Sequence, residues 1–181
     1  GPSVGKLLPK VQATAKILYK IYIALTVVLI ILLLLGGIPL YDSLCAAFGT
    51  AGTGGFGIKP DSMGSYSLYI QIVITVFMIL FGVNFNVYFL LLTKKFSQAL
   101  KSEEVRCYFI VIIVSALMIT FNVRHLFNNV WEALQQSFFQ VGSIITTTGY
   151  ATTDYNQWPA VSRTILVLLT FCGACAGSTQ A

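Results

Sequence analysis

Charge is what this sequence lacks. Only 9% of its 181 residues are charged, 56% are hydrophobic, and the mean hydropathy is +0.81. A soluble domain carries roughly 25% charged residues, so this chain has too little polar surface for an aqueous environment. The composition therefore excludes a cytosolic enzyme, an extracellular disulfide domain and a disordered segment.

Residues that support catalysis, metal binding or nucleic-acid binding are also scarce. The chain has six acidic residues and one histidine, and its net charge of +5 is too sparse for a nucleic-acid surface. We interpret the four cysteines as buried thiols, because they lie in apolar or semi-apolar stretches: Cys45, Cys107, Cys172 and Cys175. Cys172 and Cys175 have the Cys-x-x-Cys spacing, but neither a second pair nor a nearby histidine accompanies them. We expect no enzyme activity, no organic cofactor and no transition-metal site.

Long apolar runs predict membrane helices rather than one large core. We expect four spans: one from near Gln12 to Leu35, one over Ser67–Leu92, one from Cys107 past Arg124, and one that begins near Val161 and ends early, at Gly173, Gly177 and Ser178.

The placement of basic residues predicts the orientation. Eight of them flank the N-terminus and the 93–106 connection: Lys6, Lys10, Lys16, Lys20, Lys94, Lys95, Lys101 and Arg106. Three remain for the other side, namely Lys59, Arg124 and Arg163. The positive-inside rule then predicts a cytoplasmic N-terminus. The two connections 37–66 and 122–160 would face outside.

These two outer connections resemble each other. At an offset of 94 positions, Ser43 aligns with Ser137, Leu44 with Phe138, Thr53 with Thr147, Gly55 with Gly149 and Phe56 with Tyr150. The order of span, apolar loop with Thr-x-Gly-aromatic, and span also repeats, which indicates an internal duplication.

A short helix followed by a Gly/Thr stretch is typical of a re-entrant pore loop. Asp42 and Glu132 stand near the starts of the two expected short helices, where a carboxylate can cap free N–H groups. Glycine tolerates a positive φ, so that successive carbonyls can turn toward one axis and replace the hydration shell of a cation. Thr147, Gly149 and Tyr150 match the first, third and fourth residues of the potassium-channel filter Thr-Val-Gly-Tyr-Gly. The alternative interpretation is that these small residues only allow tight helix packing.

Four segments together carry a resemblance to a known family. They are Ala47–Gly57, Phe81–Asn86, Phe139–Ser143 with Thr146–Thr152, and Cys175–Thr179. With them the chain resembles the Trk/Ktr/HKT superfamily of potassium transporters, specifically the TrkH/TrkG-type pore subunits of bacteria. In that family, four helix–pore-loop–helix repeats surround one K⁺ path.

The resemblance implies that this chain holds the second and third repeats. It places filter residues at Gly52, Thr53, Gly54, Gly55 and Phe56 and at Thr146, Thr147, Thr148, Gly149 and Tyr150, with K⁺ as the transported ion. It also implies an intramembrane gate at Gly173, Gly177, Ser178 and Thr179. The partners implied are the lipid bilayer, the remaining repeats or a second copy in a homodimer, and a cytoplasmic nucleotide-binding regulatory ring. The location implied is the bacterial inner membrane.

We therefore predict an all-α membrane protein with two tandem helix–re-entrant loop–helix units, half of a pseudo-four-fold pore. The expected units are residues 1–93 and 107–181, joined by a cytoplasmic linker over 94–106. Because a chain that ends at Ala181 would stop inside the bilayer, we expect a fragment of a longer protein. Two other functions stay open: a broken-helix secondary transporter of Na⁺ or a small solute, and a non-conducting structural membrane subunit.

Overall fold

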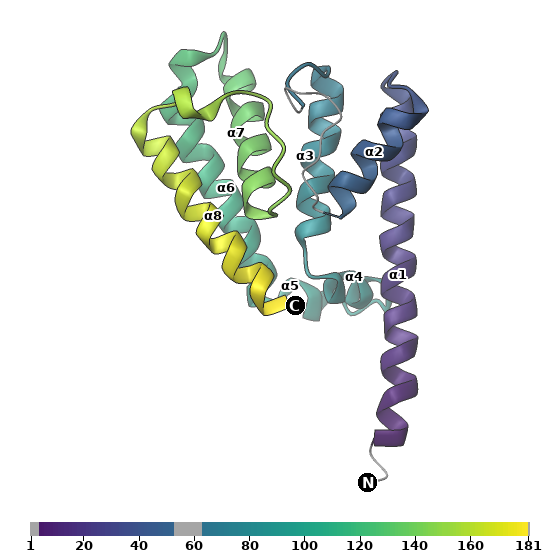
Figure 1. Cartoon of the computed structure of the whole chain (residues 1–181). Coiled ribbons are helices and arrows are strands. Elements are labelled where there is room, and N and C mark those ends of the chain that lie inside the picture. Colours follow the sequence, from purple (N-terminus) through teal and green to yellow (C-terminus); the bar gives the residue numbers. More distant parts are fainter. Residues whose placement is uncertain (1–3, 53–62, 181) are drawn as a thin grey trace.

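The structure is a computed structural model that describes residues 4–52 and 63–180. The described residues form helices without strands (Figure 1). The helices are α1 (Val4–Leu35), α2 (Leu40–Ala51), α3 (Leu68–Gly82), α4 (Phe85–Leu92), α5 (Phe96–Leu100), α6 (Glu103–Val123), α7 (Val130–Ile145) and α8 (Ala160–Gln180), with 3₁₀ turns η1 (Arg124–Leu126) and η2 (Tyr155–Gln157).

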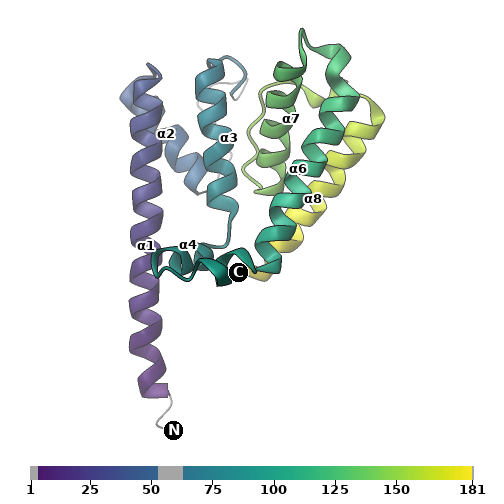
Figure 2. The ribbon, with the colours of Figure 1, turned by 180° about the vertical axis from the view of Figure 1, so that it is seen from behind.

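Two groups of three helices make up most of the described structure, and α4 and α5 lie between them along the chain. α1, α2 and α3 pack around one buried apolar cluster, and α6, α7 and α8 pack around another. In each group the short helix, α2 or α7, follows a longer one along the chain and begins at the end of the molecule opposite the N-terminus (Figures 1 and 2). The sequence-based prediction of an all-helical fold is confirmed.

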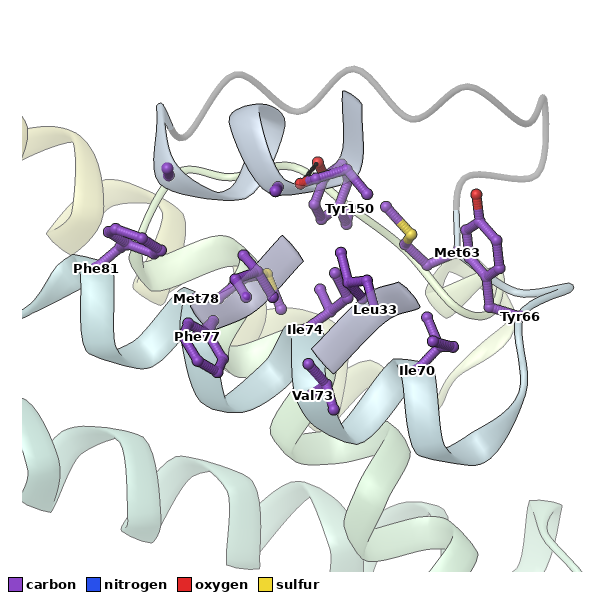
Figure 3. Close-up of a cluster of buried hydrophobic side chains, with 14 of the residues drawn as sticks. Leu33, Met63, Tyr66, Ile70, Val73, Ile74, Phe77, Met78, Phe81 and Tyr150 are labelled. Atoms are coloured by element: carbon purple, nitrogen blue, oxygen red, sulfur yellow. Dashed lines mark hydrogen bonds between the residues drawn. The ribbon is translucent and has the colours of Figure 1, made fainter. Parts of the chain in front are cut away.

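The two groups are joined by direct packing of α7 against α3. Phe139 of α7 and Tyr150, which follows α7 in the chain, are buried in the cluster that α1, α2 and α3 form. Figure 3 shows Tyr150 in this cluster with Ile74 and Met78. Two large aromatic side chains from the second group therefore complete the core of the first.

The expected second span over Ser67–Leu92 is not one straight helix. α3 ends at Gly82, α4 begins at Phe85, and the two helices meet at 87°. Val83 has an extended backbone (φ −72°, ψ 143°), and the Asn84 side chain accepts a hydrogen bond from the Asn86 N–H at 3.0 Å. An N-cap of this kind starts a new helix. α4 then turns toward α1 and packs against it (Figure 1).

The expected early end of the fourth span is also wrong, because α8 continues through Gly173, Gly177 and Ser178 to Gln180. A glycine costs only about 1 kcal/mol relative to alanine within a helix, which packing against α6 and α7 can offset. The third helix begins earlier than expected, at Glu103, and gives way to η1 at Arg124.

Hydropathy and length identify the helices that can cross a membrane. Among the described residues, Pro9–Leu35 and Glu103–Leu126 pass both criteria, and the bent pair α3–α4 adds a third if it counts as one span. Ala160–Gly173 is a shorter apolar helix.

Candidate functional site

The short helices α2 and α7 end at equivalent positions. α2 ends at Ala51 and α7 at Ile145, which are 94 residues apart, the offset that aligns the two sequence segments. The next residues also match in conformation: Gly52 has φ −84° and ψ 0°, and Thr146 has φ −89° and ψ 0°. The backbone therefore follows the sequence similarity at the point where each helix gives way to its Gly/Thr segment.

Both short helices have the electrostatic polarity expected from the sequence. Asp42 lies in the first turn of α2 and Glu132 in the first turn of α7, and neither helix has a basic residue in its last turn. The side chain that caps α7 is Asn129, which accepts a hydrogen bond from the Glu132 N–H at 2.8 Å, so the prediction of carboxylate caps is wrong in detail. Within its own last turn, neither helix has a base to compensate the partial negative charge at its C-terminus.

The segment after α7 has an unusual backbone. Thr147 has φ +58° and Gly149 has φ +84°. Glycine adopts this left-handed conformation freely, whereas for threonine it costs roughly 1–2 kcal/mol. The sequence predicts the positive φ of Gly149 but not that of Thr147.

Hydrogen bonds hold the two ends of this segment. The Thr146 hydroxyl donates to the Gly142 carbonyl at 2.6 Å, and the Thr148 N–H donates to the Ser143 carbonyl at 2.9 Å. The Ser143 hydroxyl donates to the Tyr150 carbonyl at 2.6 Å. Ser143 is fully buried and was not anticipated as a site residue.

The carbonyl oxygens between these two ends differ from the carbonyl oxygens that follow them in their hydrogen bonding. The Tyr150 carbonyl accepts from Ser143, and the Ala151 carbonyl accepts from the Met63 N–H at 2.9 Å. In the part of the chain that the structure describes, no hydrogen bond reaches the carbonyl oxygens of residues 146–149. Thr146 and Thr148 are buried, whereas Thr147 and Gly149 are exposed. We take this run of carbonyls as the candidate ligand set in the second unit.

The first Gly/Thr segment is described only at its start. Gly52 caps α2, with its N–H donating to the Phe48 carbonyl at 2.8 Å. The other predicted filter residues of this unit lie outside the described residues: Thr53, Gly54, Gly55 and Phe56. Tyr150 nevertheless links the two units, because its hydroxyl donates to the Ala46 carbonyl of α2 at 3.3 Å (Figure 3).

Gly173 lies against the end of α7. A Cβ at this position would be 2.8 Å from the Ile145 carbonyl oxygen and 3.1 Å from that of Ile144. The absence of a side chain is what allows α8 to approach the α7 C-terminus so closely. The other predicted gate residues, Gly177, Ser178 and Thr179, lie within α8.

The prediction of buried thiols is wrong for two cysteines, because Cys107 and Cys172 are exposed; Cys45 is partly buried. The side chain of Cys175 lies outside the part of the chain that the structure describes. Among the described residues there is no group of three or more His, Cys, Asp or Glu side chains able to hold a metal ion.

Comparison with known proteins decides the family. The TrkH family model, described as "Cation transport protein", matches residues 3–181. The chain belongs to this family. It is 32% identical over 181 residues to the Trk system potassium uptake protein TrkH of Salmonella typhimurium, covering 97% of the chain and 37% of that protein. It is 30% identical over 177 residues to the Trk system potassium uptake protein TrkG of Escherichia coli, covering 96% of the chain and 36% of that protein.

A solved structure is also similar to the chain. The crystal structure of the potassium transporter TrkH from Vibrio parahaemolyticus matches with a TM-score of 0.81 and 27% identity, over 90% of this chain and 36% of that one. The chain thus spans little more than a third of the length of the relatives it matches. The resemblance read from the sequence is confirmed, and with it an integral membrane protein.

Proposed function

We propose that this chain forms two of the units that surround a K⁺ path, and that backbone oxygens of residues 146–149 and 52–56 replace the hydration shell of the ion and coordinate it, with Tyr150 closing the second segment. The observation that carries the proposal is the run of carbonyls at 146–149, which no hydrogen bond from the described residues reaches, between two hydrogen-bonded ends. Carbonyl oxygens presented in this way replace the hydration shell of K⁺. The family membership and the names of the relatives, which are potassium uptake proteins, support the choice of ion.

Helix polarity supports the same function. α2 and α7 end next to their Gly/Thr segments, and neither last turn contains a base. Each helix C-terminus carries about half a negative charge, which favours a cation within about one helical turn of that end.

Two units make half of a pseudo-four-fold ring. The proposal therefore includes two further units, supplied by the rest of a longer protein or by a second copy of the chain. The units are residues 1–93 and 107–181, with residues 94–106 as a cytoplasmic linker. A cytoplasmic N-terminus, a bacterial inner membrane, a homodimer and a nucleotide-binding regulatory ring belong to the same proposal.

The end of α8 is proposed as the gate, at Gly173, Gly177, Ser178 and Thr179. The contact of Gly173 with the backbone of Ile144 and Ile145 supports this role, because any shift of α8 there moves the base of the candidate filter.

Gly149→Ser tests the filter. A serine at φ +84° strains the backbone and displaces the adjacent carbonyls. We expect weaker K⁺/Na⁺ discrimination, seen as a lower Na⁺ concentration that halves uptake of radiolabelled Rb⁺ by cells without other K⁺ uptake systems. Gly142→Ser is the matched control, because a Cβ there meets its nearest atom, of Ile79, at an ordinary 3.5 Å. Unaltered Rb⁺ uptake and Na⁺ block in Gly149→Ser would contradict the proposal.

A further inference from the structure

A series of hydrogen-bonded polar side chains connects α7 to α3 next to the candidate filter segment. The Gln140 amide donates to the Thr152 hydroxyl at 3.4 Å, and the Thr152 hydroxyl donates to the Gln136 side-chain oxygen. The Gln136 amide in turn donates to the Gln71 side-chain oxygen at 3.1 Å. We name Gln140, Thr152, Gln136 and Gln71 the glutamine relay.

The relay ends on backbone of the first unit. The Gln71 amide donates to the carbonyls of Met63 at 3.3 Å and Tyr66 at 3.2 Å. Every hydrogen bond along the relay points in the same direction, from Gln140 to Met63. Bonds aligned in this way polarise and strengthen one another, and a break in such a buried network leaves partners unpaired.

Two of the four members are buried. Gln140 is 0% exposed and Gln71 is 6% exposed, whereas Gln136 and Thr152 are partly buried. The Gln140 side-chain oxygen has no hydrogen-bond partner among the described residues. A membrane protein retains buried amides of this kind at a cost of about 1–3 kcal/mol for an unmatched group, which points to a role beyond packing.

Thr152 places the relay at the end of the candidate filter segment. It follows Ala151, whose carbonyl accepts from the Met63 N–H at 2.9 Å. The segment after Tyr150 is therefore attached at two points. Its backbone bonds to Met63 of the first unit, and the Thr152 side chain bonds to Gln136 of α7. The free carbonyls at 146–149 lie between this attachment and the one at Thr146 and Ser143.

We infer that the glutamine relay positions the 146–150 segment and sets its discrimination between K⁺ and Na⁺. The inference rests on the proposed function. The relay residues do not coordinate the ion. They act by fixing the spacing of the carbonyls that coordinate it. The relay links the filter segment of the second unit, through Gln71, to helix α3 of the first unit.

Thr152→Val and Gln136→Leu test the inference, since each breaks the relay and keeps the side-chain volume. The protein that carries this chain is expressed in cells without other K⁺ uptake systems. The readout is the Na⁺ concentration that halves Rb⁺ uptake, a quantity independent of the amount of transporter. We expect it to fall about tenfold, the equivalent of ~1.4 kcal/mol, with the maximal rate per molecule changed less. Thr152→Ser keeps the hydroxyl and should restore discrimination.

Gln135→Leu is the matched control. Gln135 is the neighbour of Gln136 on α7, and its amide donates to the Thr75 hydroxyl at 3.4 Å, outside the relay. It should keep wild-type discrimination. In the double variant Gln136→Leu/Thr152→Val the loss should be smaller than the product of the single losses, because both changes break the same bond.

The outcomes separate the two proposals. A wild-type protein that takes up no Rb⁺ overturns the proposed function itself. Wild-type uptake with unchanged Na⁺ block in Thr152→Val and Gln136→Leu overturns only the relay. If both variants merely lower the amount of protein in the membrane, or are absent from it, the relay is a folding element and the inference is wrong.

Discussion

The hydroxyl of Tyr150 donates a hydrogen bond to the carbonyl of Ala46, a residue 104 positions earlier in the chain. Tyr150 is 1% exposed, and its ring lies in the cluster formed by α1, α2 and α3. The aromatic residue that closes the second Gly/Thr segment is thus also a core residue of the first unit. One side chain therefore links the second Gly/Thr segment to α2, the helix that precedes the first Gly/Thr segment.

Tyr150→Phe should weaken this support. It keeps the ring and removes one buried hydrogen bond, so we expect a loss of roughly 0.5–1.5 kcal/mol. A lower thermal midpoint of the detergent-solubilised protein measures the loss. Tyr19→Phe, at a position 69% exposed on α1, should leave the midpoint unchanged. Equal midpoints for the two variants would show that the Ala46 bond contributes nothing.

Thr147→Gly should stabilise the protein. At φ +58° a threonine is strained, and glycine removes roughly 1 kcal/mol of that strain. Thr153→Gly is the control, because Thr153 is not among the non-glycine residues with positive φ and a glycine there gains nothing. The check is the thermal midpoint of each variant. A fall in the midpoint for Thr147→Gly would contradict the assigned backbone conformation.

Gly173→Ala should disturb the contact between α8 and α7. The new methyl group would lie 2.8 Å from a backbone oxygen, which cannot move aside as a side-chain tip can. We expect a loss of about 1–3 kcal/mol, typical of overpacking, measured by thermal unfolding. Gly142→Ala should be tolerated, since its nearest neighbour stands at 3.5 Å. Similar stability of the two variants would refute close packing at Gly173.

The sequence predicted the helices better than their ends. Apolar runs placed α1, α3, α6 and α8, and the repeat at an offset of 94 predicted a short helix before each Gly/Thr segment, as α2 and α7 are. The break between Gly82 and Phe85 was missed, because apolar residues continue through both helices and hydropathy carries no signal for a change of direction. The end expected at Gly173 was wrong because packing outweighs the modest cost of glycine within a helix.

The candidate site was predictable only in part. The positive φ of Gly149 follows from residue type, whereas that of Thr147 does not, because threonine ordinarily avoids this conformation. The glutamine relay joins residues 65 positions apart, between Gln71 and Gln136, and only the tertiary structure brings them together. A glutamine within a predicted apolar span was the one sequence signal for it. The filter and gate roles themselves stay predictions.

The right-angle turn between α3 and α4 has a mechanical consequence. α4 leaves α3 at nearly a right angle and packs against α1, and the chain then continues through α5 to α6 (Figures 1 and 2). Because α4 is continuous with α3 and packs against α1, a displacement of α4 would be transmitted to both of these helices.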